Sequence, residues 1–244
     1  MAKKECKFFC KSFDGSINYT SDGNFIYAEK DGVIVRLDLF DGHYYKLRPF
    51  DGIPILEIDG LRMQLVRDFK TPLDYAKEVV KQLRISKKGE FSVFDSCMGL
   101  GYTAIEAAKQ SSVKMVVTCE FSPAVITLAQ WNPFSDFLFA KNTKIVLMRG
   151  SSSELINDFQ SNMFDFVIHD PPRFSHAPDL YSKEFYSNLH RVCKKNARIF
   201  HYVGSVGKEK GRKIESEVQK RLSAIGFKNI KHIARLQGLV FEKL

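Results

Sequence analysis

The stretch from residue 93 to residue 104, VFDSCMGLGYTA, constrains the fold of this chain more than any other. A short apolar run ends at Asp95, a turn with Gly99 and Gly101 follows, and the next residues favour a helix. Glu120 closes the following apolar run. Glycines let a backbone approach a ligand, a helix N-terminus offers free N–H groups, and an acid about 20 residues further on can bond a ribose diol. The stretch therefore predicts the first strand, turn and helix of a nucleotide-binding βαβ unit.

The same turn discriminates among nucleotide ligands. A dinucleotide site needs G-x-G-x-x-G, and a phosphate-binding loop needs G-K-[ST]. The turn matches neither, and Cys97 takes the place of the first glycine in a D-x-G-x-G-x-G pattern. Asp95 at the strand end, with the two glycines, favours a cationic nucleoside without phosphate, such as S-adenosylmethionine (SAM). An ordinary glycine turn in an α/β domain is the alternative interpretation.

The length of 244 residues, 44% of them hydrophobic, allows one large core and a small accessory domain. No apolar run approaches the ~18 residues of a membrane span, and the first residues do not resemble a secretory signal. The five cysteines, an odd number, are expected to be reduced thiols of a cytoplasmic protein. Cys6 and Cys10 have no second pair to complete a zinc site, so no metal is predicted.

Positive charge is concentrated in the last quarter of the chain. Residues 181–244 hold 15 Lys/Arg against 5 Asp/Glu, whereas residues 1–180 hold 22 against 23. A concentrated basic surface is typical of proteins that bind polyanions, so the predicted partner is RNA (tRNA or rRNA), bound through this quarter. Solvated, lysine-rich helix faces are the alternative.

The first part of the chain carries a different pattern. Six Asp-Gly pairs lie 8 to 10 residues apart within the first 62 residues, at 14–15, 22–23, 31–32, 41–42, 51–52 and 59–60. Asp-Gly tolerates the positive φ angles of two-residue hairpin turns, and β-rich runs lie between the pairs. Residues 1–70 are therefore predicted to form a small antiparallel β-meander domain.

Residues 71–244 alternate strand and helix patterns, which is typical of a mostly parallel sheet with helices on both faces. The last two strands have no helix between them, so one of the two is expected to be antiparallel. The predicted fold class is α/β, the doubly wound, seven-stranded, Rossmann-like class I SAM-methyltransferase domain. The expected strands include residues 91–95, 144–148, 164–170, 198–203, 229–235 and 238–243, and the expected helices 71–83, 124–131, 182–192 and 211–225.

A second chemical motif, HDPPRF at residues 169–174, follows the fourth strand of this domain. Ligands of open α/β sheets bind beyond the carboxyl ends of the strands, so the motif should face the same crevice as the glycine turn. Its carboxylate and two prolines form rigid acceptors that can orient an amino group toward a sulfonium methyl. The predicted catalytic residues are Asp170, Pro171 and Pro172, and the predicted substrate-binding residues are Arg173, Phe174, Tyr181 and His201. A turn that merely ends the strand, with packing roles for Tyr181 and for the histidines His169 and His201, is the alternative.

These motifs resemble those of the predicted archaeal SAM-dependent methyltransferases with a spermidine-synthase-like fold. The resemblance rests on CMGLG at residues 97–101, on NPFS at 132–135, on IHDPPRFS at 168–175 and on FHYVG at 200–204, and it extends over roughly residues 44–240. It implies that Cys97 is usual for the family. The family tends to have Gly-Asp where this chain has Gly150 and Ser151, and a histidine where this chain has Gln64.

From the motifs and the resemblance together, we expect the following cofactor-binding residues. The turn after the first strand would hold the methionine part of SAM, Glu120 the ribose, and Phe121 with Ser151 the adenine edge. The full predicted set is Asp95, Ser96, Cys97, Met98, Gly99, Gly101, Thr103, Glu120, Phe121, Ser151 and Ser152.

The leading functional hypothesis is methyl transfer from SAM to an exocyclic amino nitrogen of an RNA base. The alternative is aminopropyl transfer from decarboxylated SAM to a polyamine, since that fold is shared; acidic residues around a cationic amine would favour it. A pyrimidine-carbon methyltransferase would need a cysteine nucleophile after the fifth strand, where the chain has none. A module of this fold that only binds RNA is a further hypothesis.

Overall fold

The computed structural model describes residues 8–12, 15–30, 32–141, 143–204 and 208–244. Within these residues a seven-stranded sheet forms the centre, in the order β11-β10-β9-β12-β13-β15-β14. The strands from β9 to β13 run parallel, and β15 is antiparallel to both its neighbours. This confirms the predicted fold class. The strands are β9 (Phe91–Asp95), β10 (Val113–Glu120), β11 (Ile145–Arg149), β12 (Phe164–His169), β13 (Cys193–Tyr202), β14 (Lys228–Ile233) and β15 (Gly238–Lys243).

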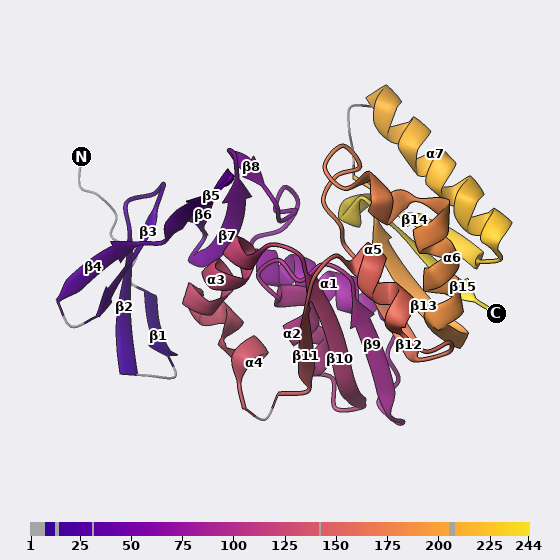
Figure 1. The fold of residues 1–244 in the computed structure, drawn as a ribbon, viewed down its shortest axis with the longest axis horizontal. Coiled ribbons are helices and arrows are strands. Elements are labelled where there is room, and N and C mark those ends of the chain that lie inside the picture. The colour runs from indigo at the N-terminus through magenta and orange to yellow at the C-terminus, as the bar shows by residue number, and fades with distance from the viewer. Residues whose placement is uncertain (1–7, 13–14, 31, 142, 205–207) are drawn as a thin grey trace.

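Helices cover both faces of this sheet (Figure 1). The two faces hold separate apolar cores, one with residues of α1, α2 and α3 and the other with residues of α6 and α7. Neighbouring residues of β9 show the alternation: Val93 belongs to the first core and Phe94 to the second, as the period of two in a strand requires. The helices are α1 (Pro72–Leu83), α2 (Tyr102–Ala108), α3 (Pro123–Trp131), α4 (Asp136–Phe139), α5 (Ser152–Leu155), α6 (Lys183–Val192) and α7 (Lys208–Ile225).

The N-terminal region forms two four-stranded antiparallel sheets, where the sequence predicted one meander. Leu37, between them, explains the break: its N–H donates to Ile26 of one sheet, and its carbonyl accepts from Leu47 of the other. Its side chain is buried in the core that also contains α1. The strands are β1 (Phe8–Ser12), β2 (Gly15–Ser21), β3 (Ile26–Lys30) and β4 (Val33–Arg36), then β5 (Asp38–Asp41), β6 (His43–Phe50), β7 (Ile53–Ile58) and β8 (Leu61–Arg62).

The Asp-Gly pairs form the predicted two-residue hairpin turns at two places, whereas at 22–23 and 41–42 only the glycine has positive φ. At 51–52 and 59–60 both residues of each pair have positive φ, the backbone of a two-residue hairpin turn. Asp14 and Asp31 lie outside the described residues, as does Cys6. In Figure 1 the sheet β1–β4 lies at one end of the molecule, while β5–β8 lies against the seven-stranded domain. The domain division at residue 70 stays a prediction.

Helix α1 begins where the sequence predicts. The Thr71 hydroxyl accepts from the Asp74 N–H at 3.1 Å, the Asp74 carboxylate accepts from the Thr71 N–H at 3.1 Å, and Pro72 occupies the first helical position. This reciprocal cap fixes the first turn of α1. The consequence for the site is the placement of Tyr75, one residue after Asp74.

Candidate active site

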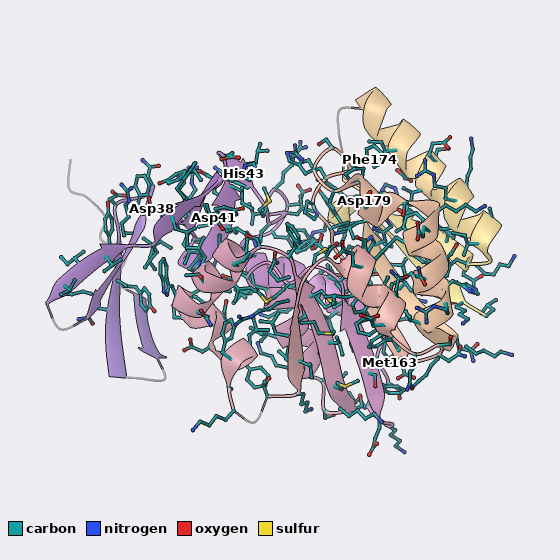
Figure 2. All side chains as sticks on the ribbon, viewed as in Figure 1. Asp38, Asp41, His43, Met163, Phe174 and Asp179 are labelled. Carbon is teal, nitrogen blue, oxygen red and sulfur yellow. The ribbon has the colours of Figure 1, made fainter. Side chains whose placement is uncertain are left out.

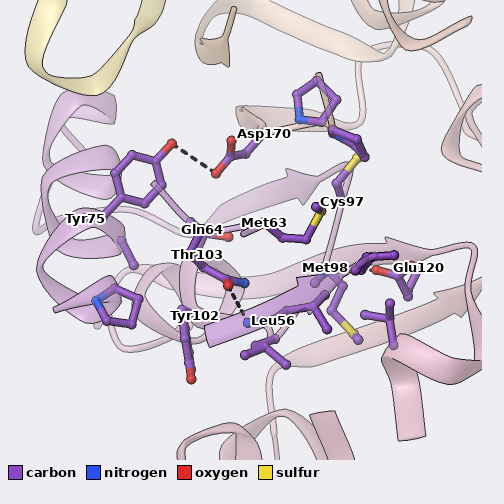
Figure 3. Close-up of a pocket in the computed structure, with 18 residues that line it drawn as sticks. Leu56, Met63, Gln64, Tyr75, Cys97, Met98, Tyr102, Thr103, Glu120 and Asp170 are labelled. Carbon is purple, nitrogen blue, oxygen red and sulfur yellow. Dashed lines mark hydrogen bonds between the residues drawn. The ribbon is translucent and has the colours of Figure 1, made fainter. Parts of the chain in front are cut away.

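A pocket lies beyond the carboxyl ends of β9, β10 and β12, where ligands of open α/β sheets bind. This inner pocket has a volume of about 740 Å³, which includes space open to solvent. Figure 3 shows α1 on one side of it and Glu120 on the other. It is lined by Leu56, Ile58, Met63, Gln64, Pro72, Tyr75, Ala76, Cys97, Met98, Gly99, Leu100, Tyr102, Thr103, Glu120, Val125, Asp170, Pro171 and Pro172.

The glycine turn after β9 forms one wall of the inner pocket. Gly99 and Gly101 have φ angles of 54° and 76°, which L side chains rarely adopt. At Gly101 an added Cβ would also lie 3.0 Å from Leu138 Cδ2. The Gly101 N–H donates to the Met98 carbonyl at 2.7 Å, which closes the turn immediately before α2. The two glycines therefore allow the tight turn that brings the backbone of residues 97–100 to the pocket.

Glu120 ends β10 on the pocket wall and is fixed by backbone groups. Its Oε2 accepts from the Gly99 N–H at 3.0 Å, and its Oε1 accepts from the Ser122 N–H at 3.0 Å. Burial raises the pKa of Glu120 to about 6, while these two N–H groups act in the opposite direction. Each carboxylate oxygen keeps a second lone pair. The fixed carboxylate can therefore accept the hydroxyls of a ribose diol, as the sequence predicts for this position.

The N-terminal region supplies part of the same pocket. Gln64 accepts the Leu56 N–H through Oε1 at 2.7 Å, so its amide NH₂ is free to face the glycine turn. Tyr102, in the first turn of α2, donates its hydroxyl to the Pro54 carbonyl at 2.7 Å and accepts from Asn132 at 2.9 Å. These bonds join β7 to the glycine turn. The pocket is therefore shared by both predicted domains.

Asp170, directly after β12, is the second carboxylate of the inner pocket. The Tyr75 hydroxyl donates to its Oδ2 at 3.0 Å, as the dashed line in Figure 3 marks. Burial raises the pKa of Asp170 to about 7, and the bond from Tyr75 lowers it against that effect. No described group donates to the other carboxylate oxygen, Oδ1. Asp170 can therefore accept an N–H from a ligand and titrates close to neutral pH.

Asp95 and Ser96 lie beneath the glycine turn, where the sequence predicted cofactor contacts. Asp95 is 0% exposed, and its two oxygens accept the hydroxyls of Thr103 at 3.2 Å and Thr118 at 2.6 Å. Burial raises the pKa of Asp95 to about 7. Neither residue belongs to the pocket lining. Asp95 therefore ties the turn to α2 and β10, and the expected direct contact is corrected to a supporting role.

Tyr181 was predicted to bind substrate, but it is 1% exposed. The Tyr181 hydroxyl donates to the Pro172 carbonyl at 2.9 Å, and the Arg221 guanidinium donates to the Tyr181 carbonyl at 2.9 Å. Phe174, which is 41% exposed, packs edge-on against its ring. Because its hydroxyl is used and its ring is covered, Tyr181 braces the loop that carries Asp170.

His201 was also predicted to contact substrate, and it is 0% exposed. Its Nε2 lies 2.8 Å from the Tyr186 hydroxyl and its Nδ1 3.3 Å from the His169 carbonyl. His169, equally buried, lies 2.6 Å from the Ser96 hydroxyl and 2.9 Å from the Leu180 carbonyl. A carbonyl only accepts, so the ring nitrogen facing it carries a proton. Burial lowers the pKa of both histidines, that of His169 to about 3, which keeps both rings neutral. The predicted substrate contact of His201 is corrected to a structural bond between strand ends.

Of the remaining predicted cofactor residues, some line the inner pocket and others lie outside its lining. Cys97, Met98, Gly99, Thr103 and Glu120 line the inner pocket together. Burial and nearby acids raise the pKa of Cys97 well above its ordinary value, so its thiol is protonated. Ser151 and Ser152 follow β11 outside the lining, where the Ser151 hydroxyl bonds Ser153 at 2.7 Å.

A wider groove opens beside the inner pocket. This outer groove encloses about 2110 Å³, part of it open to solvent, and shares Ile58, Met63, Gln64, Pro171 and Pro172 with the inner pocket. Its walls come from the sheet β5–β8 and from the loop after β12. In Figure 2, His43 of the sheet β5–β8 and Phe174 of the loop after β12 both lie in the upper part of the molecule, apart from each other. Its other lining residues are His43, Tyr45, Phe50, Asp59, Leu61, Arg62, Leu65, Val66, Arg67, Phe121, Arg173, His176, Tyr202 and Gln237.

The charges of the outer groove were only partly predicted from the sequence. Arg173 lines it, as expected for a substrate-binding residue, and so do Arg62 and Arg67, which the sequence analysis did not single out. Phe121, predicted at the adenine edge, is 76% exposed in this groove. Residues 62–67, RMQLVR, follow the last Asp-Gly pair, and the two arginines that flank this mostly apolar segment were the available signal.

Two structural features, a membrane-spanning helix and a metal-binding cluster, would indicate other classes of protein. No helix in the described residues combines the length and the apolar character needed to span a membrane. No group of three or more His, Cys, Asp or Glu side chains within the described part of the chain is arranged to hold a metal ion. The side chains of Cys6 and Cys10 lie outside that part.

Comparisons with known proteins give a consistent family. The model of the spermine/spermidine synthase domain matches residues 54–234. An uncharacterized protein of Methanocaldococcus jannaschii is 41% identical over 233 residues, which cover 95% of this chain and 78% of that protein. The crystal structure of spermidine synthase from Thermotoga maritima superposes with a TM-score of 0.68 at 16% identity, covering 100% of this chain and 81% of that one. A spermidine synthase in complex with the transition-state analogue AdoDATO gives 0.68 at 17% identity, with the same coverage.

Proposed function

The chain belongs to the spermine/spermidine synthase domain family, and from that premise we propose that it transfers an alkyl group from an S-adenosyl sulfonium to an amine. The observation that carries the proposal is the pair of fixed carboxylates in one pocket. Glu120 is held by backbone N–H groups on one side, and Asp170 is held by Tyr75 on the other.

The inner pocket suits an S-adenosyl group because of the hydrogen-bonding groups that line it. Glu120 would accept the ribose hydroxyls, the backbone of residues 97–100 would border the nucleoside, and Gln64 would offer its NH₂. Acidic groups and the absence of any Lys, Arg or His from its described lining favour a cation there. A bound S-adenosyl donor would supply a carbon made electrophilic by the neighbouring sulfonium.

Asp170 performs the acceptor side of the reaction. Its free oxygen accepts one N–H of the acceptor amine, which fixes the nitrogen and directs its lone pair into the inner pocket. The Pro171 carbonyl is a second rigid acceptor. As the new N–C bond forms and the C–S bond breaks, the nitrogen loses a proton. The ionised carboxylate of Asp170 accepts that proton. A pKa of about 7 suits this exchange at neutral pH.

The finer proposal is methyl transfer from SAM to an exocyclic amino group of an RNA base. It is favoured by the outer groove, which borders Pro171 and Pro172 and carries three arginines and one aspartate, Asp59. Such a field repels a polyamine and attracts an anionic acceptor. Asp59 is itself paired with His43 at 2.5 Å.

Aminopropyl transfer from decarboxylated SAM is the second candidate. The family model and the two spermidine synthase structures favour it over methyl transfer. The inner pocket adds a physical reason, because none of its described lining residues is a cation that could neutralise the carboxylate of SAM. Decarboxylated SAM lacks that carboxylate.

The test supplies both donors in parallel, each with radioactive label on the transferred group. Pooled unmodified tRNA, rRNA, protein and polyamines serve as acceptors, with Asp170→Asn as the control. Label passing from SAM into RNA, and lost in the variant, is the expected result. Label passing only from decarboxylated SAM into polyamines would replace methyl transfer by aminopropyl transfer. Transfer from neither donor would overturn the proposal.

A further inference from the structure

We propose that the outer groove, and not the basic last quarter of the chain, binds the phosphates of a nucleic-acid acceptor. The proposal rests on the proposed function, because it assigns the acceptor side of the same site. The residues that carry it are Arg62, Arg67 and Arg173.

The three arginines reach the groove from two distant segments. Arg62 ends the hairpin β7–β8, Arg67 lies in the loop before α1, and Arg173 follows the Asp170-Pro171-Pro172 segment. All three side chains are exposed, and no ion pair joins any of them to an acidic group in the described part of the chain. By contrast, Arg36, Arg48 and Arg198 each pair with a carboxylate. The groove therefore keeps its guanidinium groups available for a ligand.

Guanidinium groups select the chemistry of that ligand. Each presents a rigid fork of N–H donors that matches the oxygens of phosphate in a bidentate manner. Three forks around one groove fit an acceptor with several phosphates better than a single carboxylate.

An aromatic side chain lies in the same groove. Phe121 is 76% exposed there, although a phenylalanine of this size is usually buried. Exposed aromatic rings stack on unpaired bases in proteins that bind single strands. Phe121 directly follows Glu120, so a base stacked on it lies beside the inner pocket. The geometry thus places phosphate binding, stacking and Asp170 along one continuous surface.

The basic last quarter makes little contribution to this surface. Of the groove lining, only Tyr202 and Gln237 come from residues 181–244, and neither carries a positive charge. Lys220, Lys228 and Lys231 are exposed on α7 and β14, outside the lining. These lysines provide a matched control with the same change of charge.

The test measures binding of an unmodified tRNA transcript to the full chain by fluorescence anisotropy. The triple variant Arg62→Gln, Arg67→Gln and Arg173→Gln is compared with the triple variant Lys220→Gln, Lys228→Gln and Lys231→Gln. We expect about tenfold or greater loss of affinity in the arginine variant and less than about twofold loss in the lysine variant at equal salt. The salt dependence of the affinity should weaken by about two in log–log slope only in the arginine variant, from three single-strand phosphate contacts.

Two further measurements make the result decisive. Melting temperature and binding of S-adenosylhomocysteine establish that each variant is folded and that its inner pocket is intact. If S-adenosylhomocysteine fails to bind the unaltered chain, the proposed function fails independently of the groove. Adenosine monophosphate, tested beside the transcript, separates a free nucleotide from a strand: equal affinity for both would reassign the phosphates to a free nucleotide. Equal losses in both triple variants, or no binding of either probe, would overturn the proposal.

Discussion

The inner pocket and the outer groove are neighbours that share two prolines, yet they carry opposite charge. Glu120 and Asp170 line the pocket without any cation in its described lining, whereas three arginines line the groove with one aspartate. In the proposed transfer, the acidic surface would face the donor of the group and the basic surface would face its acceptor.

This difference bears separately on the donor and on the acceptor of the proposed transfer. An acidic pocket suits any S-adenosyl sulfonium, which is common ground for methyl and aminopropyl transfer. A basic groove is unsuited to polyamines, which are polycations. The pocket therefore fits the family comparison, while the groove argues for another acceptor. Experiments that affect one surface and leave the other unchanged test this division.

The largest expected effect comes from Asp170, which lines the inner pocket directly before the two prolines that both surfaces share. Asp170→Asn keeps the size of the side chain and its bond from Tyr75 but removes the charge that accepts a proton. We expect the transfer rate to fall about 10²- to 10⁴-fold, as for loss of a general base. Single-turnover kinetics measure the rate, and calorimetry with S-adenosylhomocysteine measures the donor affinity, which should change less than about threefold. A variant of full activity would remove Asp170 from the chemistry.

The pH dependence of the transfer rate should also be large. Burial raises the pKa of Asp170 to about 7, so below that pH the carboxyl is already protonated and cannot take the proton that the amine releases. The rate should therefore rise about tenfold per pH unit below pH 7 and level off above it. A pH series of single-turnover rates checks this expectation, with Asp170→Asn as the flat reference. A rate that rises as the pH falls below 7 would contradict the assigned role.

Glu120→Gln should lower the affinity for the S-adenosyl donor without changing the affinity for the acceptor. The amide can accept only one of the two backbone N–H groups, from Gly99 and Ser122, that the carboxylate accepts together. It also loses the charge that faces the ribose. We expect about tenfold lower affinity for S-adenosylhomocysteine, on the order of one charge-assisted hydrogen bond. Affinity for the tRNA transcript should stay within about twofold, and a parallel loss of both affinities would show that the two surfaces are not independent.

The sequence predicted the seven-stranded sheet and eight of the 18 residues that line the inner pocket, because their signals are local. Positive φ at Gly99 and Gly101, and an acid at the end of the next strand, are properties of short segments. Asp170 was equally readable from the motif that contains it. The roles of Asp95 and Tyr181 were not, because a carboxylate or an aromatic ring after a strand fits either a ligand contact or a brace. The buried hydroxyl partners Thr103 and Thr118 decide the matter for Asp95.

The outer groove was hidden from the sequence for a different reason. Charge counted along the chain indicated residues 181–244, whereas Arg62, Arg67 and Arg173 lie in segments of almost balanced charge. Their concentration appears only when the sheet β5–β8 packs beside the loop after β12. Charge per segment and charge per surface are separate quantities, and only the fold relates one to the other.

The smallest expected effect concerns Tyr75, which lies 95 residues before its partner Asp170. The hydroxyl of Tyr75 lowers the pKa of Asp170, so Tyr75→Phe should raise that pKa and move the inflection of the pH–rate profile above 7. At pH 7 the rate should fall only a few-fold, because the carboxylate loses one hydrogen bond that favours its ionised form. The loss should disappear at pH 9, where the carboxylate is ionised in both proteins.

Tyr102→Phe is the matched control for this variant. It removes another buried hydroxyl from the same pocket, one bonded to the Pro54 carbonyl and not to a carboxylate. Both variants should lower the free energy of unfolding by about 1 kcal/mol, measured by urea denaturation. Only Tyr75→Phe should move the inflection of the profile. If both variants move it equally, the inflection reports the packing of the pocket, and the assignment of proton transfer to Asp170 fails with it.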